Sequence, residues 1–477
     1  MKKTCGVWFV LSLLAVGVFG TPVSRAQGRK AASGSGADSG ILAEETPAPA
    51  AASPAGLDQR IEALEAELTA LKLEMAAKKD AEAAPAAISP ATAVADDAKP
   101  PEKVSIASLL GPTSISGFVD GYYQVDTNHP FPRTNVGLRP FDFRDKSISL
   151  NMAEVILDKA PDPMGGAEGK TGYHVSIGFG DAMRAVNGPD PVGSFVADYL
   201  KEAYFSYLAP VGSGLQIDVG KFVTPMGAEV IESKDNWNYS RGLLFGYAIP
   251  YYHFGARAKY TFNAKYNLTG FVVNGWNNIA DNNSGKTFGF SFVGNPTKTV
   301  SYTINYLAGP EQNTGFYGTA LNSNDVWRQT WDAVVTYNPT AKLSLMANFD
   351  YGRGDRFCCA DATPPYSAPV YWTGGAAYAK YAIDANDYLA GRYEYYYDPN
   401  GWSFQSSPGG VAGNHVQEGT ITYQRTVASH LLTRLEYRYD NSVKPMFFVG
   451  AAGIPLAKSQ NTIELGLIFL FDSRDMK

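Results

Sequence analysis

The sequence predicts an all-β fold, a transmembrane antiparallel up-and-down β-barrel of about 16 strands that follows a short coiled-coil helix. Three observations predict it. From residue 114 onward, polar and apolar residues alternate with period 2 in runs of about ten residues. Tight turns and long loops alternate between these runs. Beyond the amino-terminal leader no apolar run reaches about 18 residues, the length that a spanning helix needs, so only a closed barrel could cross a membrane.

The amino terminus has the pattern of a secretory signal peptide. Met1, Lys2 and Lys3 supply a positive start, and residues 7–19 are nearly all apolar. Small residues at positions 24 and 26 fit a cleavage site, so we expect residues 1–26 to be removed and the mature chain to begin near Gln27. Cys5 would leave with this segment.

Between the leader and the barrel we expect an arm of three parts. Residues 27–56 and 81–113 are rich in Ala, Gly, Ser and Pro, which is typical of flexible linkers. Residues 57–80 carry a heptad pattern and are predicted to form a coiled-coil helix. The apolar heptad positions are Leu57, Ile61, Leu64, Leu68, Leu71 and Met75.

The charges beside this heptad fit a parallel partner helix. In the predicted register Arg60 faces Glu65 of the partner, and Glu67 faces Lys72, so both pairs attract. The alternative is a lone amphipathic helix with ion pairs within it. The residues at the heptad core do not distinguish a dimer from a trimer.

The clearest strand pattern covers residues 431–440. One face carries Leu431, Thr433, Leu435, Tyr437 and Tyr439, and the other carries Leu432, Arg434, Glu436, Arg438 and Asp440. A soluble sandwich would not bury two arginines and two acids on one strand. A membrane barrel reverses the sides, because its apolar face meets lipid and its charged face meets water in the lumen.

The same interpretation along the chain gives the barrel as residues 114–477. The strands are expected to start near residues 115, 146, 172, 198, 215, 252, 266, 285, 299, 326, 342, 369, 387, 416, 431 and 461. Glu154 and Lys221 have the parity of lipid-facing residues, so we expect bulges or rim positions there. Long loops include 223–250, 354–368, 399–414 and 442–458. Short turns are typical of the periplasmic rim, which predicts an outer-membrane location with the amino-terminal arm in the periplasm.

Composition and motifs argue against other classes of protein. The net charge of −6 does not favour nucleic-acid binding. The five histidines are scattered and share no triad or metal-ligand spacing with one another, so we expect no enzyme, no metal and no cofactor. Cys358 and Cys359 are adjacent in a predicted loop; a vicinal disulfide, two free thiols and an intermolecular bridge all remain open.

Several stretches resemble the OmpL-like β-barrel porin family. One is Ser116-Gly117-Phe118-Val119-Asp120-Gly121-Tyr122-Tyr123, with Leu138-Arg139-Pro140-Phe141-Asp142 and Ser149-Leu150-Asn151-Met152-Ala153-Glu154 after it. Another is Gly220-Lys221-Phe222-Val223-Thr224-Pro225-Met226-Gly227, which continues to Tyr239-Ser240-Arg241 and Pro250-Tyr251-Tyr252-His253-Phe254-Gly255. The likeness spans roughly residues 105 to 477. The terminal Glu464-x-Gly466-x-x-Phe469-x-Phe471 resembles the recognition signal of outer-membrane barrels, although Asp472 to Lys477 follow it.

The resemblance implies a porin, a water-filled channel for passive diffusion of small hydrophilic solutes or ions. A barrel of this size is too wide for its own side chains to fill. By resemblance the protein would be a homo-oligomer in outer-membrane lipid, with a trimer favoured. The alternative function is a structural barrel tethered to the cell wall through its periplasmic coiled coil.

The longest loop, 223–250, is the candidate constriction. In classical porins a loop at the corresponding place folds into the lumen, and charges of both signs across a pore create a field that orients solutes. The candidate residues are Glu229, Glu232, Lys234, Asp235 and Arg241. The alternative is a solvated external loop.

Strand parity gives candidate pore-lining residues. They are Asp120, Asp218, Arg257, Lys259, Asp350, Arg392, Glu394, Arg434, Glu436 and Arg438. Acids modestly outnumber bases among all inward positions, which predicts a mild preference for cations.

Overall fold

The computed structural model describes residues 113–133, 136–187, 198–312, 323–354, 369–404, 413–451 and 455–474. The predicted signal peptide, linker 27–56 and coiled-coil helix 57–80 lie outside these ranges. So do Cys358 and Cys359.

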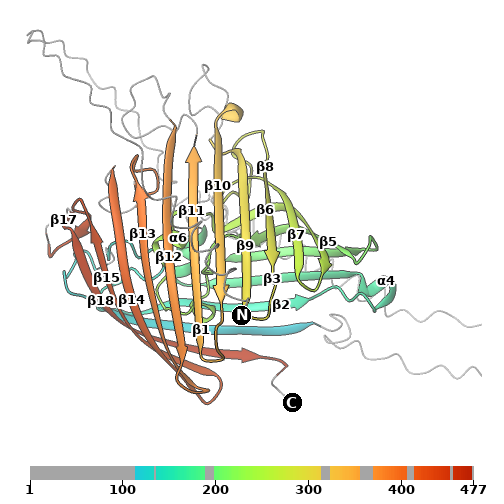
Figure 1. Ribbon diagram of the computed structural model, residues 1–477. Coiled ribbons are helices and arrows are strands. Elements are labelled where there is room, and N and C mark those ends of the chain that lie inside the picture. Colours follow the sequence, from blue (N-terminus) through green and yellow to red (C-terminus); the bar gives the residue numbers. More distant parts are fainter. Residues whose placement is uncertain are drawn as a thin grey trace, which may run out of the picture. The chain divides into compact units, whose positions relative to one another are not determined.

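Sixteen strands close into one antiparallel barrel, as the sequence predicts (Figure 1). They are β1 (Ser114–Asp126), β2 (Ile148–Lys159), β3 (Thr171–Phe179), β4 (Leu200–Ala209), β5 (Leu215–Val223), β6 (Tyr252–Asn263), β7 (Tyr266–Val273), β8 (Thr287–Gly294), β9 (Val300–Pro310), β10 (Trp327–Tyr337), β11 (Leu343–Gly354), β12 (Val370–Ala382), β13 (Asp387–Asp398), β14 (Asn414–Val427), β15 (Leu431–Ser442) and β18 (Ser459–Asp472). Every predicted start lies within two residues of the observed one.

Each barrel strand pairs with its neighbours along the chain, and β1 pairs with β18 to close the sheet. The connection between β15 and β18 also holds a small separate sheet, β16 (Phe447–Phe448) with β17 (Pro455–Ala457). The sequence did not predict this hairpin, because strands of two and three residues are too short to show alternation.

The short connections all lie at one end of the barrel, called here the turn end, and the long ones lie at the opposite loop end. The turn between β4 and β5 shows why glycine is needed there: Gly212 and Gly214 have φ of 57° and 108°. A Cβ on Gly212 would also lie 2.2 Å from the Tyr260 hydroxyl oxygen. The tight turns therefore follow from local sequence.

The outer face of the barrel is apolar, as predicted. On β15, Leu435 is 54% exposed while Arg434 is 1% exposed, so the two faces of that strand separate as the alternation requires. Exposed aromatic rings, among them Tyr207 and Tyr381 at the turn end and Tyr351 at the loop end, flank the apolar band. Such rings prefer membrane interfaces.

Glu154 and Lys221 have the strand parity of lipid-facing residues, but neither contacts lipid. A register shift between Asp120 and Gly121 in the pairing of β1 with β2 places Glu154 opposite Phe118, where it is buried. This confirms the expected bulge. Lys221 is also buried, and its Nζ donates to Asn187 Oδ1 at 2.7 Å.

The helices of the described chain are short and lie in the connections. They are α4 (Gly166–Gly169), α5 (Asp181–Asn187) and α6 (Leu243–Tyr247), with the 3₁₀ turns η1 (Ser233–Asp235) and η2 (Ser323–Asp325). None of the described helices is long and apolar enough to cross a bilayer.

Candidate functional site

The connection between β5 and β6, residues 224–251, folds into the barrel; we call it the lumenal loop. Its first residues contact inward side chains of three successive strands. Asn305 Nδ2 on β9 donates to Pro225 O at 3.1 Å, and Gly227 N donates to Asp332 Oδ1 on β10 at 3.0 Å. Ala228 N donates to Asn348 Oδ1 on β11 at 3.3 Å. The alternative of a solvated external loop is therefore wrong.

Arg392 on β13 holds the middle of the lumenal loop. Its Nη1 lies 2.5 Å from Glu229 Oε1 and donates to Ser240 O at 2.6 Å. Its Nε donates to Glu418 Oε1 on β14 at 2.7 Å. Glu229 also accepts a bond from Gly242 N at 2.6 Å, which joins the two halves of the loop. One buried guanidinium thus connects the wall to both halves.

Acidic side chains of the wall accept hydrogen bonds from backbone amides and hydroxyl groups of the loop. Glu436 on β15 accepts from Tyr239 N at 2.6 Å and from Ser240 N at 3.1 Å. Asp120 on β1 accepts from the Tyr239 hydroxyl at 2.7 Å and from Ser233 Oγ at 2.6 Å. Irregular backbone leaves its polar groups without partners, so these carboxylates satisfy donors that no ladder supplies.

Arginines of the wall donate to the loop's carbonyls in the same way. Arg434 Nη1 donates to Ser233 O at 2.5 Å, and its Nη2 donates to Asn236 O at 2.8 Å. Arg438 Nη1 donates to Arg241 O at 2.8 Å. The alternating acids and bases that identified β15 as a barrel strand are therefore the groups that bind the loop.

Arg241 shapes the loop from within. It is fully buried, and it donates to Ile231 O at 3.0 Å and to Tyr239 O at 3.1 Å. A third bond, at 3.2 Å, reaches Asn151 Oδ1 on β2. Because Arg241 bonds residues ten and two positions before it, it fixes the fold of the loop.

An ion pair attaches the lumenal loop to β4, on the other side of the lumen from β13–β15. Lys201 contacts Glu232 of the loop and Glu154 of β2, the latter at 2.5 Å. Burial alone would raise the pKa of Glu232, but the Lys201 ammonium beside it holds that pKa below its usual value.

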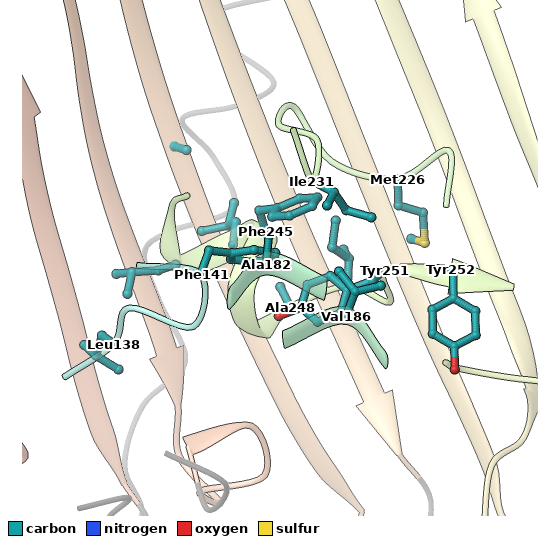
Figure 2. Close-up of a cluster of buried hydrophobic side chains, with 14 of the residues drawn as sticks. Leu138, Phe141, Ala182, Val186, Met226, Ile231, Phe245, Ala248, Tyr251 and Tyr252 are labelled. Atoms are coloured by element: carbon teal, nitrogen blue, oxygen red, sulfur yellow. The ribbon is translucent and has the colours of Figure 1, made fainter. Parts of the chain in front are cut away.

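Apolar residues pack inside the barrel where three connections meet (Figure 2). Phe141, from the connection between β1 and β2, has its ring centroid 5.7 Å from that of Phe245 and 5.5 Å from that of Tyr251. Ala182 and Val186 of α5 belong to the same buried cluster. Lipid is outside a barrel, so an apolar cluster inside it excludes water from part of the lumen.

Arg139 anchors the connection between β1 and β2, and the sequence did not predict this role. Its Nε donates to Asp142 Oδ2 at 2.6 Å, and its Nη1 donates to Thr462 Oγ1 on β18 at 2.7 Å. Its Nη2 lies 2.5 Å from Glu464 Oε2, also on β18. The signal was present in Leu138-Arg139-Pro140-Phe141-Asp142, since apolar residues around a lone arginine are unusual for a solvated loop.

Three tryptophans gather at the loop end of the lumen. The rings of Trp372 and Trp402 stack at 3.8 Å, and Trp276 meets both edge-on. Trp372 Nε1 donates to Ala248 O of the lumenal loop at 3.0 Å. The Arg328 guanidinium lies 4.8 Å from the Trp402 ring centroid. This cluster holds the end of the loop against β12.

The candidate constriction residues divide by exposure. Glu229 and Arg241 are buried in the contacts above, and Glu232 contacts Lys201. Lys234 and Asp235 form an ion pair at 2.5 Å with side chains 23% and 54% exposed. These two charges are the ones that the loop presents to solvent.

The candidate pore-lining residues point inward, but most are covered. Lys259 is exposed and the Arg257 side chain is 22% exposed. The others are buried; these are Asp120, Asp218, Asp350, Arg392, Glu394, Arg434, Glu436 and Arg438. Parity alone could not show this, because the covering residues come from distant connections.

Solvent reaches inward residues elsewhere, on β6 to β9 near the turn end. Lys259 and Thr261 of β6 are exposed, and Thr269 of β7 and Thr303 of β9 are half-buried. On β13 to β15 and β18 the comparable positions, such as Ala390 and Ile468, are buried. Near the turn end the lumen therefore has one covered wall, β13–β15 with β18 and β1, and one open wall, β6–β9; farther from the turns the inward residues of β7–β9, such as Phe271 and Asn305, are buried as well. Among the described residues no group of three or more His, Cys, Asp or Glu is placed to hold a metal ion.

A closed antiparallel barrel of sixteen strands, apolar outside and with a loop inside its lumen, defines an outer-membrane barrel of the porin class. The family described as "Putative beta-barrel porin-2, OmpL-like" matches residues 112–471. The chain belongs to this family, and it is an outer-membrane β-barrel porin, not an enzyme. The resemblance found in the sequence is thereby confirmed.

Solved structures with a similar fold share little sequence with the chain. The trimer form of OmpT from Vibrio cholerae is 12% identical with a TM-score of 0.46, covering 75% of this chain and 99% of that one. An anion-selective porin from Comamonas acidovorans is 8% identical with a TM-score of 0.48, with coverage of 75% and 99%. The channel DcaP of Acinetobacter baumannii is 10% identical with a TM-score of 0.47, covering 75% and 97%. No curated protein matches the chain.

Proposed function

We propose that the protein forms a narrow water-filled channel for passive diffusion of small hydrophilic solutes or ions, with the lumenal loop as its constriction. The observation that carries this proposal is the fixed position of the loop. Wall residues from β1 to β15 bind it through Asp120, Arg392 and Glu436, so it reduces the open cross-section rather than moving in solvent.

The open wall supports a diffusive path. Thr261, Thr269 and Thr303 offer hydroxyl groups to water near the turn end. A hydrated solute can exchange its water contacts for such hydroxyls at little cost. This chemistry favours small polar solutes over any single substrate.

The exposed pair of the loop adds an orienting element. Lys234 and Asp235 present opposite charges to the lumen, and a dipole there acts on polar solutes that pass the loop. The buried Glu229, Glu232 and Arg241 serve this function indirectly, since they hold the loop that carries the pair.

Single-channel recording tests the proposal. The purified full chain should produce discrete, ohmic conductance steps in a planar bilayer. A variant lacking residues 228–247 should produce larger steps, because conductance grows with open cross-section. Absence of any channel from correctly folded protein would overturn the proposal, and equal steps from the two proteins would remove the constriction.

We propose further that the turn end faces the periplasm and that the arm of residues 27–113 is periplasmic. Short turns at that end support this orientation. The heptad at residues 57–80 supports a homo-oligomer, with a trimer as the expected form, in outer-membrane lipid. Light scattering measures the oligomeric state of the detergent-solubilised full chain and of a variant that lacks residues 27–103.

The heptad also favours a second function, a tether between the barrel and the cell wall. The variant that lacks residues 27–103 distinguishes the tether function from the channel function. A tether loses its attachment to the cell wall when residues 27–103 are removed, whereas conductance through the barrel remains.

A further inference from the structure

We propose that the channel prefers anions, and that Lys259 and Lys380 are the residues that set this preference. The inference rests on the proposed channel function and names the class of solute that it favours. It differs from the mild cation preference that the count of inward acids and bases predicts, because burial and pairing decide which charges a permeating ion meets.

Most inward acids never meet the lumen. Asp120 and Glu436 accept hydrogen bonds from the lumenal loop, and Glu418 accepts from Arg392. Glu394 and Glu464 are each 1% exposed or less. A charge that is covered by protein and neutralised by a partner acts weakly on an ion in the channel.

The inward acids that solvent does reach are each paired with a base. Asp235 is 54% exposed and pairs with Lys234 at 2.5 Å. The Asp158 side chain is 42% exposed and lies 2.9 Å from His174 Nδ1, a partner that carries a positive charge only when it is protonated. Asp218, which is buried, also pairs with a base, Arg257. A close pair presents a dipole to the lumen, whose field falls off faster with distance than that of a single charge.

Lys259 and Lys380 differ from all of these. Lys259 on β6 is exposed, and it shares the inward face of that strand with Arg257, which reaches Asp218 inside the barrel. Lys380 on β12 is half-buried, with its Nζ 4.8 Å from the Trp237 ring centroid and 5.6 Å from that of Tyr388. Within the described part of the chain, neither ammonium forms an ion pair with a carboxylate.

Both lysines lie near the turn end, where the lumen is open. Lys259 pairs with Thr269 and lies four residues before the end of β6, and Lys380 lies two residues before the end of β12. Two uncompensated cations on separate walls of one opening attract anions and repel cations. At a separation of about 7 Å in water, two unit charges interact with roughly the thermal energy, so each lysine should change local ion concentrations about threefold.

The test is the reversal potential of single channels across a KCl gradient of about 0.1 M to about 0.01 M, where screening is weak. The wild-type full chain should show chloride more permeant than potassium. The variant K259Q/K380Q should lower the chloride-to-potassium permeability ratio about threefold or more. The matched control K265Q/K298Q removes two exposed lysines from the turns outside the lumen and should leave the ratio unchanged.

The results of this experiment distinguish failure of the proposed channel function from failure of the proposed anion preference. If folded wild-type protein gives no channel, the proposed function fails, and this inference fails with it. If channels form but prefer potassium, or if K259Q/K380Q and K265Q/K298Q shift the ratio equally, the channel function stands and the assignment to Lys259 and Lys380 is overturned. Heat-dependent migration of each variant in a denaturing gel confirms that the barrel is folded.

Discussion

The covered wall and the open wall of the lumen are built from the same kind of strand, yet their inward residues do different things. On the covered wall Arg392, Arg434 and Glu436 are buried and bind the lumenal loop. On the open wall Thr269 and Thr303 stay in contact with solvent. Alternation of polar and apolar residues is common to both walls, and only the covering loop distinguishes them.

An inward charge in a barrel therefore has two possible roles. It can face the solute, or it can satisfy the backbone of an irregular segment placed inside the lumen. Glu436 shows the second role clearly, since it accepts two successive backbone amides, from Tyr239 and Ser240. Charge count along the strands therefore does not measure the field in the channel.

The largest effect is expected from Arg392→Ala on the covered wall. The substitution leaves Glu229 buried without its cation and removes the nearer of the two arginines that pair with Glu418, and breaking a buried pair in this way costs about 3–5 kcal/mol. We expect a lower free energy of unfolding in urea titrations followed by tryptophan fluorescence. Arg425→Ala is the control, because its side chain is 59% exposed and its distance to Asp387 is 3.9 Å. Equal stability of the two variants would show that the covered wall does not hold the loop.

Glu436→Gln should have a smaller effect in the same direction. The amide keeps the size of the side chain and one acceptor oxygen, but it loses the charge that strengthens the bonds from Tyr239 N and Ser240 N. We expect a loss of about 1–3 kcal/mol in the same titration. An unchanged midpoint would mean that these two bonds contribute nothing to loop attachment.

Thr269→Trp tests the open wall, where we expect a substitution to change conductance rather than stability. Stability should change by no more than about 0.5 kcal/mol, because the position is half-buried and contacts no loop anchor. Single-channel conductance should fall, because the larger ring occupies the water-filled space. If the variant unfolds readily and conducts normally, the open wall has been misidentified.

The smallest effect concerns pH. The pKa of Glu232 is lowered from its ordinary value of 4.5 by Lys201, against the effect of burial. A lowered pKa in the folded state adds stability that is complete above pH 4.5 and is lost as the pH falls through the folded-state value. The difference in melting temperature between wild type and Glu232→Gln should therefore be constant above pH 5 and shrink below about pH 4.5. A difference that grows on acidification would contradict the ion pair with Lys201.

Much of the barrel could be predicted from the sequence because its pattern is local. The alternation at residues 431–440 predicted the start and the lipid-facing side of β15, which continues for two more residues to Ser442. The inward position of the lumenal loop was expected from family resemblance. Its partners were not, because contacts such as Ser233 with Asp120 join residues 113 apart and follow no periodicity.

The covering of the lumen was missed for the same reason. No local pattern marked the segment around Phe141 or helix α5 as lumenal, because their packing with Phe245 depends on three distant pieces of chain. Lys201 was also not identified, since the register shift between β3 and β4 beside it cannot be read from strand parity. Local patterns thus predict the walls of a barrel but not what fills it.

Cysteine labelling in the folded protein tests most directly whether the lumenal loop covers one wall and leaves the other open. Thr303→Cys on the open wall and Ala390→Cys on the covered wall are made separately, with Cys358 and Cys359 replaced by serine; Ala390 is 1% exposed. A small charged maleimide should label position 303 rapidly and position 390 slowly, and deleting residues 228–247 should make position 390 react as fast as position 303. Equal labelling rates at the two positions with the loop intact would contradict the account.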